Sequence, residues 1–255
     1  MEWKEVKILE IAHLKNGKKR PSNSGSYPVY GGNGIMDYVD SYNEDNVIII
    51  GRVGAYCGCV YYCDSKCWIS DNAISAKAKE DTDNVFLYYL LSNQKLNHHR
   101  IGGAQPLMTQ DIIGRINVIV PQQKEDQRRI AAILSSLDHK IELNNKINAQ
   151  LEEMAQTLFN YWFVDFGPFK NGKFIESELG MIPEGWRVEK IENLPHTLET
   201  GRRPKGGAVV DGIPSVGAEH VKGMCAYDYS KNKFIDLNFA SKLKTGKIAG
   251  YELLI

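Results

Sequence analysis

The sequence predicts an α+β protein: a β-rich domain, then a long helix of the coiled-coil type, then the start of a second domain similar to the first. Three observations predict this fold class. Runs of β-branched and aromatic residues interrupted by glycine fill the first part of the chain. About 40 residues without glycine or proline come next, and the opening pattern of the chain then returns. The predicted divisions are a first domain at 1–123, a spacer helix at 124–162, a linker at 163–183 and an incomplete second domain at 184–255.

Four segments define the secondary structure expected in the first domain. The run at 46–62 is β-branched and aromatic with glycine interruptions, which favours a hairpin or a strand pair. Two further strands are expected at 67–78 and 116–121, the second ended by proline. Residues 84–100 carry apolar side chains at helical spacing and a basic end, which predicts a helix.

The glycine-free segment predicts one long amphipathic helix. At about 1.5 Å per residue, residues 124–160 would extend over roughly 55 Å, which is more than the width of a small domain. Its apolar stripe therefore needs a partner helix, and Asn144 and Asn145 interrupt that stripe as register-setting polar residues do in coiled coils. The stripe, and hence the expected partner surface, consists of Ile130, Ile133, Leu134, Leu137, Ile141, Ile147, Leu151, Met154 and Leu158.

A repeat accounts for the second domain. The stretch "EWKEVKI" (2–8) returns as "GWRVEKI" (185–191), and "NGKKRPSNSGSYPVYGG" (16–32) resembles "TGRRPKGGAVVDGIPSVGA" (200–218). Corresponding tryptophan, proline and glycine residues keep a nearly constant offset, which chance similarity does not produce. The second copy has only about 72 residues, against about 120 in the first, so we expect an incomplete second domain.

Composition excludes some classes of protein. The formal net charge is zero, so only local charge clusters can attract nucleic acid. No apolar run of about 18 residues and no leader peptide is present, which predicts no membrane association and a cytoplasmic location.

No catalytic or cofactor-binding pattern is found. The glycine-rich stretches 31–34 and 51–54 suit tight turns, and His98-His99 lack catalytic partners. "EVK" at 5–7 ends like a nuclease motif but lacks the upstream acid, so a surface strand is favoured. Metal binding by Cys57, Cys59, Cys63 and Cys67 remains an alternative to core packing, although their spacing does not match known zinc sites. We therefore expect no catalytic residue, metal or cofactor, and we expect Cys57 and Cys59 to share one face of a strand.

Local positive charge gives the candidate binding residues. Basic side chains gather in loops around glycine and proline, and the basic loop recurs in the second copy, which favours a shared ligand over incidental surface charge. Lys and Arg suit phosphate contacts, whereas Gln, Asn and Tyr can meet base edges. The candidate DNA-binding residues are Lys15, Lys18, Lys19, Arg20, Tyr30, Asn33, Arg52, Tyr56, His98, His99, Arg100, Gln105, Arg202, Arg203 and Lys205.

Together these features resemble the specificity subunit of type I restriction-modification systems. The similarity rests on "PQQKEDQRRIAAILSSLD" (121–138), where Asp126-Gln127 replaces the usual Glu-Gln pair at the start of the spacer helix. "ELGMIPEGW" (178–186) looks like the family's second-domain start, and 51–54 and 102–106 are also similar.

The resemblance implies a DNA reader without catalysis of its own. Each recognition domain would read one half of a split target in double-stranded DNA. The helix would set the spacing and dock methyltransferase subunits, and through them the restriction subunit. Because the second domain is incomplete, we expect the helix stripe to pair with another copy in a homodimer. Two alternatives are a recognition domain of a fused restriction-methylation enzyme and a coiled-coil adaptor without a DNA role.

Overall fold

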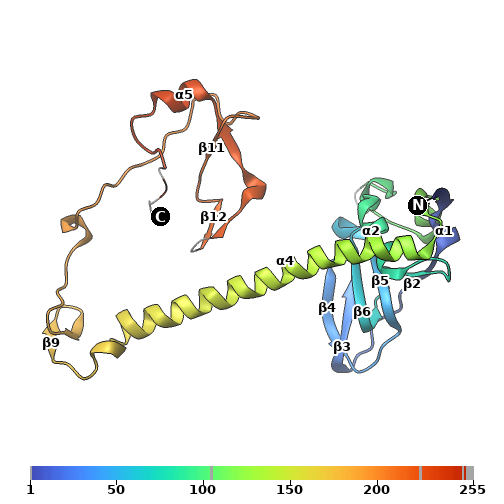
Figure 1. The fold of residues 1–255 in the computed structure, drawn as a ribbon, viewed down its shortest axis with the longest axis horizontal. Helices are drawn as coiled ribbons and strands as arrows, with labels where there is room; N and C mark the ends of the chain where they lie inside the picture. The colour runs from blue at the N-terminus through green and yellow to red at the C-terminus, as the bar shows by residue number, and fades with distance from the viewer. Residues whose placement is uncertain (1, 104–105, 224–225, 249, 251–255) are drawn as a thin grey trace. The chain divides into compact units, whose positions relative to one another are not determined.

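A computed structural model describes residues 2–103, 106–223, 226–248 and 250. The chain forms two compact units, residues 1–158 and 159–255. Within the described residues, no helix is both long and apolar enough to span a membrane. The mixture of a β-rich domain with a long helix confirms the predicted fold class (Figure 1).

A six-stranded sheet forms the centre of the first unit. Its strand order is β2-β7-β5-β6-β3-β4, and all neighbours are antiparallel except β3 and β6, which run parallel. A separate antiparallel pair joins the two ends of the domain, because β1 (Trp3–Lys7) lies against β8 (Asn117–Pro121). The sheet strands are β2 (Ala12–Asn16), β3 (Ser24–Gly31), β4 (Gly34–Val39), β5 (Glu44–Gly51), β6 (Val60–Ile69) and β7 (Ala73–Ala78).

The central strand β5 is buried on both faces, which explains its unbroken apolar sequence. Ile48 and Ile50 belong to one core cluster, whereas Val47 and Ile49 belong to another, as the alternation of side chains along a strand requires. The first cluster also takes in the helix α2 (Asn84–Asn93). The remaining short elements are the helices α1 (Ile8–Ile11) and α3 (Gln110–Gly114) and the 3₁₀ turns η1 (Gly54–Tyr56) and η2 (Leu96–His99).

The expected elements of this domain are confirmed in part. The pair predicted at 46–62 is the β5–β6 pair, and the strand predicted at 116–121 is β8. The single strand expected at 67–78 is wrong, because a turn at 70–72 separates β6 from β7. The helix expected at 84–100 is too long, since α2 ends at Asn93 and Lys95 adopts a left-handed backbone (φ 48°) before η2.

The long helix α4 (Lys124–Phe159) has 36 residues and continues as a π-helical turn, η3 (Asn160–Val164). Its first turns pack on the domain: Ala131 is buried, and Ile130 packs against the first core cluster. Ile130 was expected in the partner surface and instead contacts its own domain. Leu134 is half-buried. The rest of the stripe is 42–64% exposed: Ile133, Leu137, Ile141, Ile147, Leu151, Met154 and Leu158.

The second unit begins with an aromatic cluster around Trp186. Its ring meets Phe166 and Phe169 edge-on, with centroids 5.3 and 5.4 Å away, and Phe163 at 6.2 Å. The segment expected to be a linker thus contains folded structure, including the hairpin formed by β9 (Phe174–Ser177) and β10 (Gly180–Pro183). The short turns η4 (Gly167–Phe169) and η5 (Ile191–Asn193) lie on either side of that hairpin.

The rest of the second unit contains two small ladders and one helix. The elements are β11 (Ile213–Ser215) with β14 (Lys233–Ile235), β12 (Val221–Gly223) with β13 (Ala226–Tyr227), η6 (Tyr229–Lys231) and α5 (Leu237–Lys242). Pro214 lies on a strand, as its counterpart Pro28 does. However, Pro28 faces Tyr38 of the next strand, whereas Pro214 faces Phe234, about 20 residues later. The predicted similarity of the two domains therefore stays a prediction.

Candidate nucleic-acid interface

Several loops of the first unit meet at one end of the six-stranded sheet. Antiparallel pairing places the end of β5 beside the start of β7, with Gly51 opposite Ala73, and β2 ends there too, with Asn16 opposite Ile74. The parallel pair brings the end of β3 to the end of β6, with Tyr30 opposite Ile69. We call this group the loop cluster; its described residues are 17–20, 32–33, 52–59, 70–72, 98–103 and 106–108.

Main-chain hydrogen bonds fasten these loops to one another. The N–H of Lys18 donates to the carbonyl of Ile69 (3.0 Å), and that of Arg52 donates to Asn72 (2.9 Å). The loop before α3 is tied in by two bonds, from Gly54 N–H to Pro106 (3.0 Å) and from Met108 N–H to the carbonyl of Arg52 (2.8 Å). The loops therefore form one connected surface.

Two glycines allow this close approach. A Cβ on Gly17 would lie 2.0 Å from the carbonyl oxygen of Ser70, so only glycine fits in the basic loop at that position. Gly58 has φ +86°, and a Cβ there would lie 2.5 Å from the backbone nitrogen of Asn97. Glycine at these positions therefore lets the loop cluster assemble.

The basic residues expected in the first loop have different surroundings. Lys18 and Lys19 are exposed, and within the described part of the chain neither forms an ion pair. Arg20 is exposed but forms an ion pair with Asp37 of β4. Two lysines of this loop are thus available to an external anion, whereas Arg20 must first break its ion pair with Asp37.

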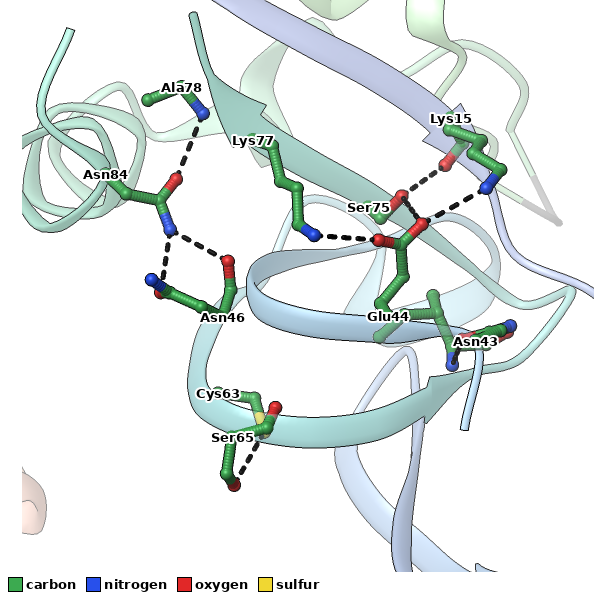
Figure 2. A network of polar contacts seen from close by, with 11 residues as sticks. Lys15, Asn43, Glu44, Asn46, Cys63, Ser65, Ser75, Lys77, Ala78 and Asn84 are labelled. Carbon is green, nitrogen blue, oxygen red and sulfur yellow. Dashed lines mark hydrogen bonds and ion pairs between the residues drawn. The ribbon is translucent and has the colours of Figure 1, made fainter. Parts of the chain in front are cut away.

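Lys15 belongs to a strand network, not to the loop where it was expected. It lies on β2, and its Nζ is 3.3 Å from Glu44, whose side chain is only 12% exposed. The same carboxylate contacts Lys77 at 3.2 Å and accepts a hydrogen bond from Ser75 at 3.5 Å (Figure 2). This geometry satisfies a mostly buried charge and links three strands, so it favours a structural role for Lys15.

The remaining polar candidates fall mostly within the loop cluster. Asn33 is exposed in the turn between β3 and β4, and Tyr56 is 51% exposed in η1. Arg52 is half-buried and donates from Nη1 to the carbonyl of Asp71 (3.2 Å), which holds its guanidinium at the surface. The basic end of η2 is exposed at His98, His99 and Arg100, whereas Gln105 lies outside the described residues.

Tyr30 points toward the interior. It is half-buried on β3 and packs against the second core cluster. Burial, followed by the neighbouring Cys63, raises the pKa of its hydroxyl. This position favours packing over contact with a base.

The four clustered cysteines pack in the first unit. Cys57, Cys63 and Cys67 are buried, Cys59 is half-buried, and all four are free thiols. The Sγ of Cys63 lies 3.3 Å from the carbonyl oxygen of Ser65 (Figure 2), and burial raises the pKa of Cys57. The described residues contain no group of three or more potential metal ligands. The expectation that Cys57 and Cys59 share a strand face is wrong, because both lie in the β5–β6 connection.

In the second unit, Arg202, Arg203 and Lys205 are exposed. Arg203 lines a hollow of about 220 Å³ together with Lys233 and the buried His220. The ring of His220 is fixed by Nε2, which lies 2.8 Å from the carbonyl oxygen of Lys231.

Two side-chain contacts on the surface could not be predicted from the local sequence pattern. Asp37 neutralises Arg20 from 17 residues away. Lys66 lies 4.6 Å above the ring of Tyr42, which itself packs on Tyr27, and so forms an exposed cation–π contact. Both depend on which strands become neighbours.

Comparison with known proteins shows what kind of domain carries this loop cluster. The sequence model of the type I restriction modification DNA specificity domain matches residues 1–153. The MjaIX specificity subunit of Methanocaldococcus jannaschii is 31% identical over 156 residues, covering 58% of this chain and 36% of that protein. The HindI specificity subunit of Haemophilus influenzae is 33% identical over 126 residues, covering 47% of this chain and 26% of that protein.

A solved structure shows the same fold. The S subunit of a type I restriction-modification system from M. genitalium superposes with a TM-score of 0.56 at 21% identity, over 83% of this chain and 61% of that chain. The chain spans about a third of the length of the curated relatives it matches. Because the family match covers more than half of the chain, the resemblance inferred from the sequence is confirmed, and the protein belongs to the family of type I restriction-modification DNA specificity domains.

Proposed function

We propose that this chain is a non-catalytic, sequence-specific DNA-binding subunit that gives a type I restriction-modification complex its target specificity. The observation that carries the proposal is the loop cluster: exposed basic and polar side chains stand on loops that main-chain bonds hold together, in a domain of the DNA-specificity family. The alternatives of a fused enzyme and of a coiled-coil adaptor have no comparable support.

The side chains divide by chemistry into two groups. Lys18 and Lys19 are exposed ammonium groups, which suit phosphates and position the duplex without reading it. Asn33 and Arg52 have planar groups that can pair with two atoms of adenine and of guanine, respectively. Tyr56 and the basic end of η2 complete the surface.

The salt dependence of DNA binding tests the phosphate contacts. Each lost phosphate contact lowers the slope of log K against log salt by about 0.9. Lys18→Ala combined with Lys19→Ala should therefore reduce the slope by roughly 2. The matched control is Lys140→Ala with Lys146→Ala, which removes the same charge from α4. Equal slopes for the two double variants would remove this loop from the interface.

The exposed stripe of α4 supports pairing with a second copy. A two-fold interface needs a self-complementary surface, and the stripe is nearly palindromic about Asn144. In an antiparallel pair centred there, Leu137 faces Leu151 of the second copy and Ile141 faces Ile147. Asn144 falls near the axis, where one polar residue fixes register at some cost in stability.

Such a dimer would carry two recognition domains, one for each half of a split target. Sedimentation equilibrium should show a dimer at micromolar concentration, and Leu137→Asp should give a monomer because it places a charge in the apolar seam. A wild-type chain that sediments as a monomer would exclude this arrangement.

The same helix is our proposed docking surface for the methyltransferase subunits, and through them for the restriction subunit, in the cytoplasm. Copurification of the chain with the modification subunit tests the contact. Methylome sequencing of a host that carries both would reveal the target. Methylation that does not depend on this chain would contradict its role as the specificity subunit.

A further inference from the structure

Polar contacts hold the spacer helix to the recognition domain in two regions, one at its start and one at Asp138. At the start, Lys124 donates to the carbonyl of Glu80 (2.6 Å) and Arg128 lies 3.8 Å from Asp83. The most buried contact there is made by Gln127, which is 2% exposed. Its Oε1 accepts the N–H of Asp83 at 2.9 Å, and its Nε2 donates to the carbonyls of Pro121 (3.0 Å) and Asp81 (3.4 Å). One buried amide thus connects the start of α4 to the end of β8 and to the residue that caps α2.

The second attachment is a hydrogen bond from α2 to α4. The hydroxyl of Tyr89 donates to Oδ2 of Asp138 at 2.6 Å. Burial, followed by the hydrogen bond to Asp138, raises the pKa of Tyr89. The Tyr89 ring packs on Tyr88, with centroids 4.9 Å apart, and Tyr88 stacks on Tyr62 of β6 at 5.5 Å. A row of aromatic rings therefore supports this bond from the sheet.

The two attachments lie on one face of the helix. Asp138 follows Gln127 by 11 residues, which is close to three turns and roughly 16 Å along the axis. Ala131 and Leu134 fall between them at the spacings of the same face, and they are buried and half-buried. Contacts at the start of α4 alone would leave the helix more freedom to tilt, whereas a further contact roughly 16 Å along the axis restricts its direction.

Direction matters because the helix extends well beyond Asp138. From Asp138 to the end of α4 at Phe159 the helix is roughly 32 Å long. A tilt of about 6° about Asp138 would move that end by roughly 3.4 Å, the rise of one base pair. A spacer that sets the distance between half-targets to within one base pair must therefore keep its helix axis within a few degrees of one direction.

We infer that Gln127 and the Tyr89–Asp138 pair are positioning residues that hold α4 in one direction relative to the recognition domain and so fix the distance between the two half-targets. The inference rests on the proposed function. It assigns to side chains outside the loop cluster a part in specificity: they select the length of the spacer and not its flanking bases.

Variants of the second attachment test the inference, because they leave the core intact. Tyr89→Phe keeps the ring and removes the donor, and Asp138→Ala removes the acceptor. Asp138→Asn is the matched control, since its amide oxygen still accepts the tyrosine hydrogen bond. Circular dichroism should show the same helix content in all three variants.

The first readout does not involve DNA. Double electron–electron resonance measures the distance between the sheet and the helix. The nitroxide labels are attached to unnatural amino acids that replace His13 of β2 and Gln150 of α4, both of which are exposed. Dilution with unlabelled chain restricts the signal to single chains. We expect a narrow distribution for the wild type and Asp138→Asn, and a distribution roughly twice as wide for the two disrupting variants, given the lever of α4. Equal widths in all chains would overturn the inference.

The second readout is the spacing of methylated targets when the chain acts with its modification subunit. The wild type and Asp138→Asn should methylate half-targets at one spacing, whereas the disrupting variants should also methylate pairs that differ by one base pair. Unchanged spacing in variants with widened distributions would overturn the role in specificity. Absence of methylation with the wild type would overturn the proposed function and, with it, the role in spacing. The distance distributions would still show whether the Tyr89–Asp138 pair holds α4 in one direction.

Discussion

Replacement of Gln127 by methionine should destabilise the first unit far more than the same change at an exposed glutamine. Methionine has nearly the same length and volume, so the core is neither emptied nor overfilled. However, it cannot accept from Asp83 or donate to Pro121; the bond to Pro121 is buried and the bond from Asp83 is partly buried. Gln127→Met therefore removes hydrogen bonds while it leaves the packing of the core almost unchanged.

The magnitude follows from the groups left behind. A buried donor or acceptor that loses its partner costs about 1–3 kcal/mol. Three main-chain groups lose a partner, but those of Asp83 and Asp81 are only partly buried, so we expect the free energy of unfolding to fall by about 2–3 kcal/mol. At a urea m-value of about 2 kcal/mol per molar, the unfolding midpoint should drop by about 1–1.5 M.

Urea unfolding followed by tryptophan fluorescence measures this change. Trp3 and Trp68 report on the first unit once Trp162 and Trp186 of the second are replaced by phenylalanine. Gln150→Met is the control, because Gln150 is exposed on the same helix and its replacement should change stability by about 0.5 kcal/mol or less. If the midpoint of Gln127→Met lies within that margin, the buried amide does not hold the start of α4.

Three further predictions concern the loops and the core. Gly58→Ala should lower the melting temperature and weaken DNA binding, because the added Cβ would collide with the backbone of Asn97. The control Gly54→Ala, at φ +74° with nothing within 4 Å of the added Cβ, should cost only about 1 kcal/mol of backbone strain. Equal melting temperatures for the two variants would contradict this prediction. Asp37→Asn should free Arg20 and steepen the salt dependence of DNA binding by about one phosphate contact. The control Asp40→Asn makes the same change in charge and should steepen it less. Identical slopes for the two variants would show that Arg20 does not contact phosphate. Leu91→Ala, in the core, should cost about 2–5 kcal/mol by calorimetry, and Leu143→Ala, on the exposed helix, far less; similar losses would refute the assigned core.

Local pattern was enough to predict the elements with the strongest signals. The β-branched run that contains β5 predicts a strand and the glycine-free segment predicts a long helix, and both are observed. The turn that divides 67–78 was also readable, because Ser70 and Asn72 are typical turn residues, and the Ser70 hydroxyl accepts the N–H of Asn72. The β-branched and aromatic residues on either side of the turn outweigh this signal in the local pattern.

The end of α2 and the make-up of the interface depended on contacts distant in sequence. Residues up to Arg100 keep helical character, yet Lys95 turns left-handed so that Leu96 reaches the core. The candidates could be found one by one as basic or polar loop residues. Their gathering, the burial of Tyr30 and the pairing of Arg20 with Asp37 follow from the β3–β6 and β3–β4 pairings, which no local pattern encodes.

The way the loop cluster is fastened has a consequence for how this protein can change over time. The bonds that join its loops, such as Arg52 to Asn72 and Gly54 to Pro106, run between main-chain atoms. Substitution of an exposed side chain such as Asn33 or Tyr56 removes none of them. We therefore expect substitutions to be tolerated at the exposed side chains that would meet the ligand, and not at Gly17 and Gly58, where two backbone segments lie in close contact. A lineage could acquire a new target by exchanging side chains on an unchanged frame.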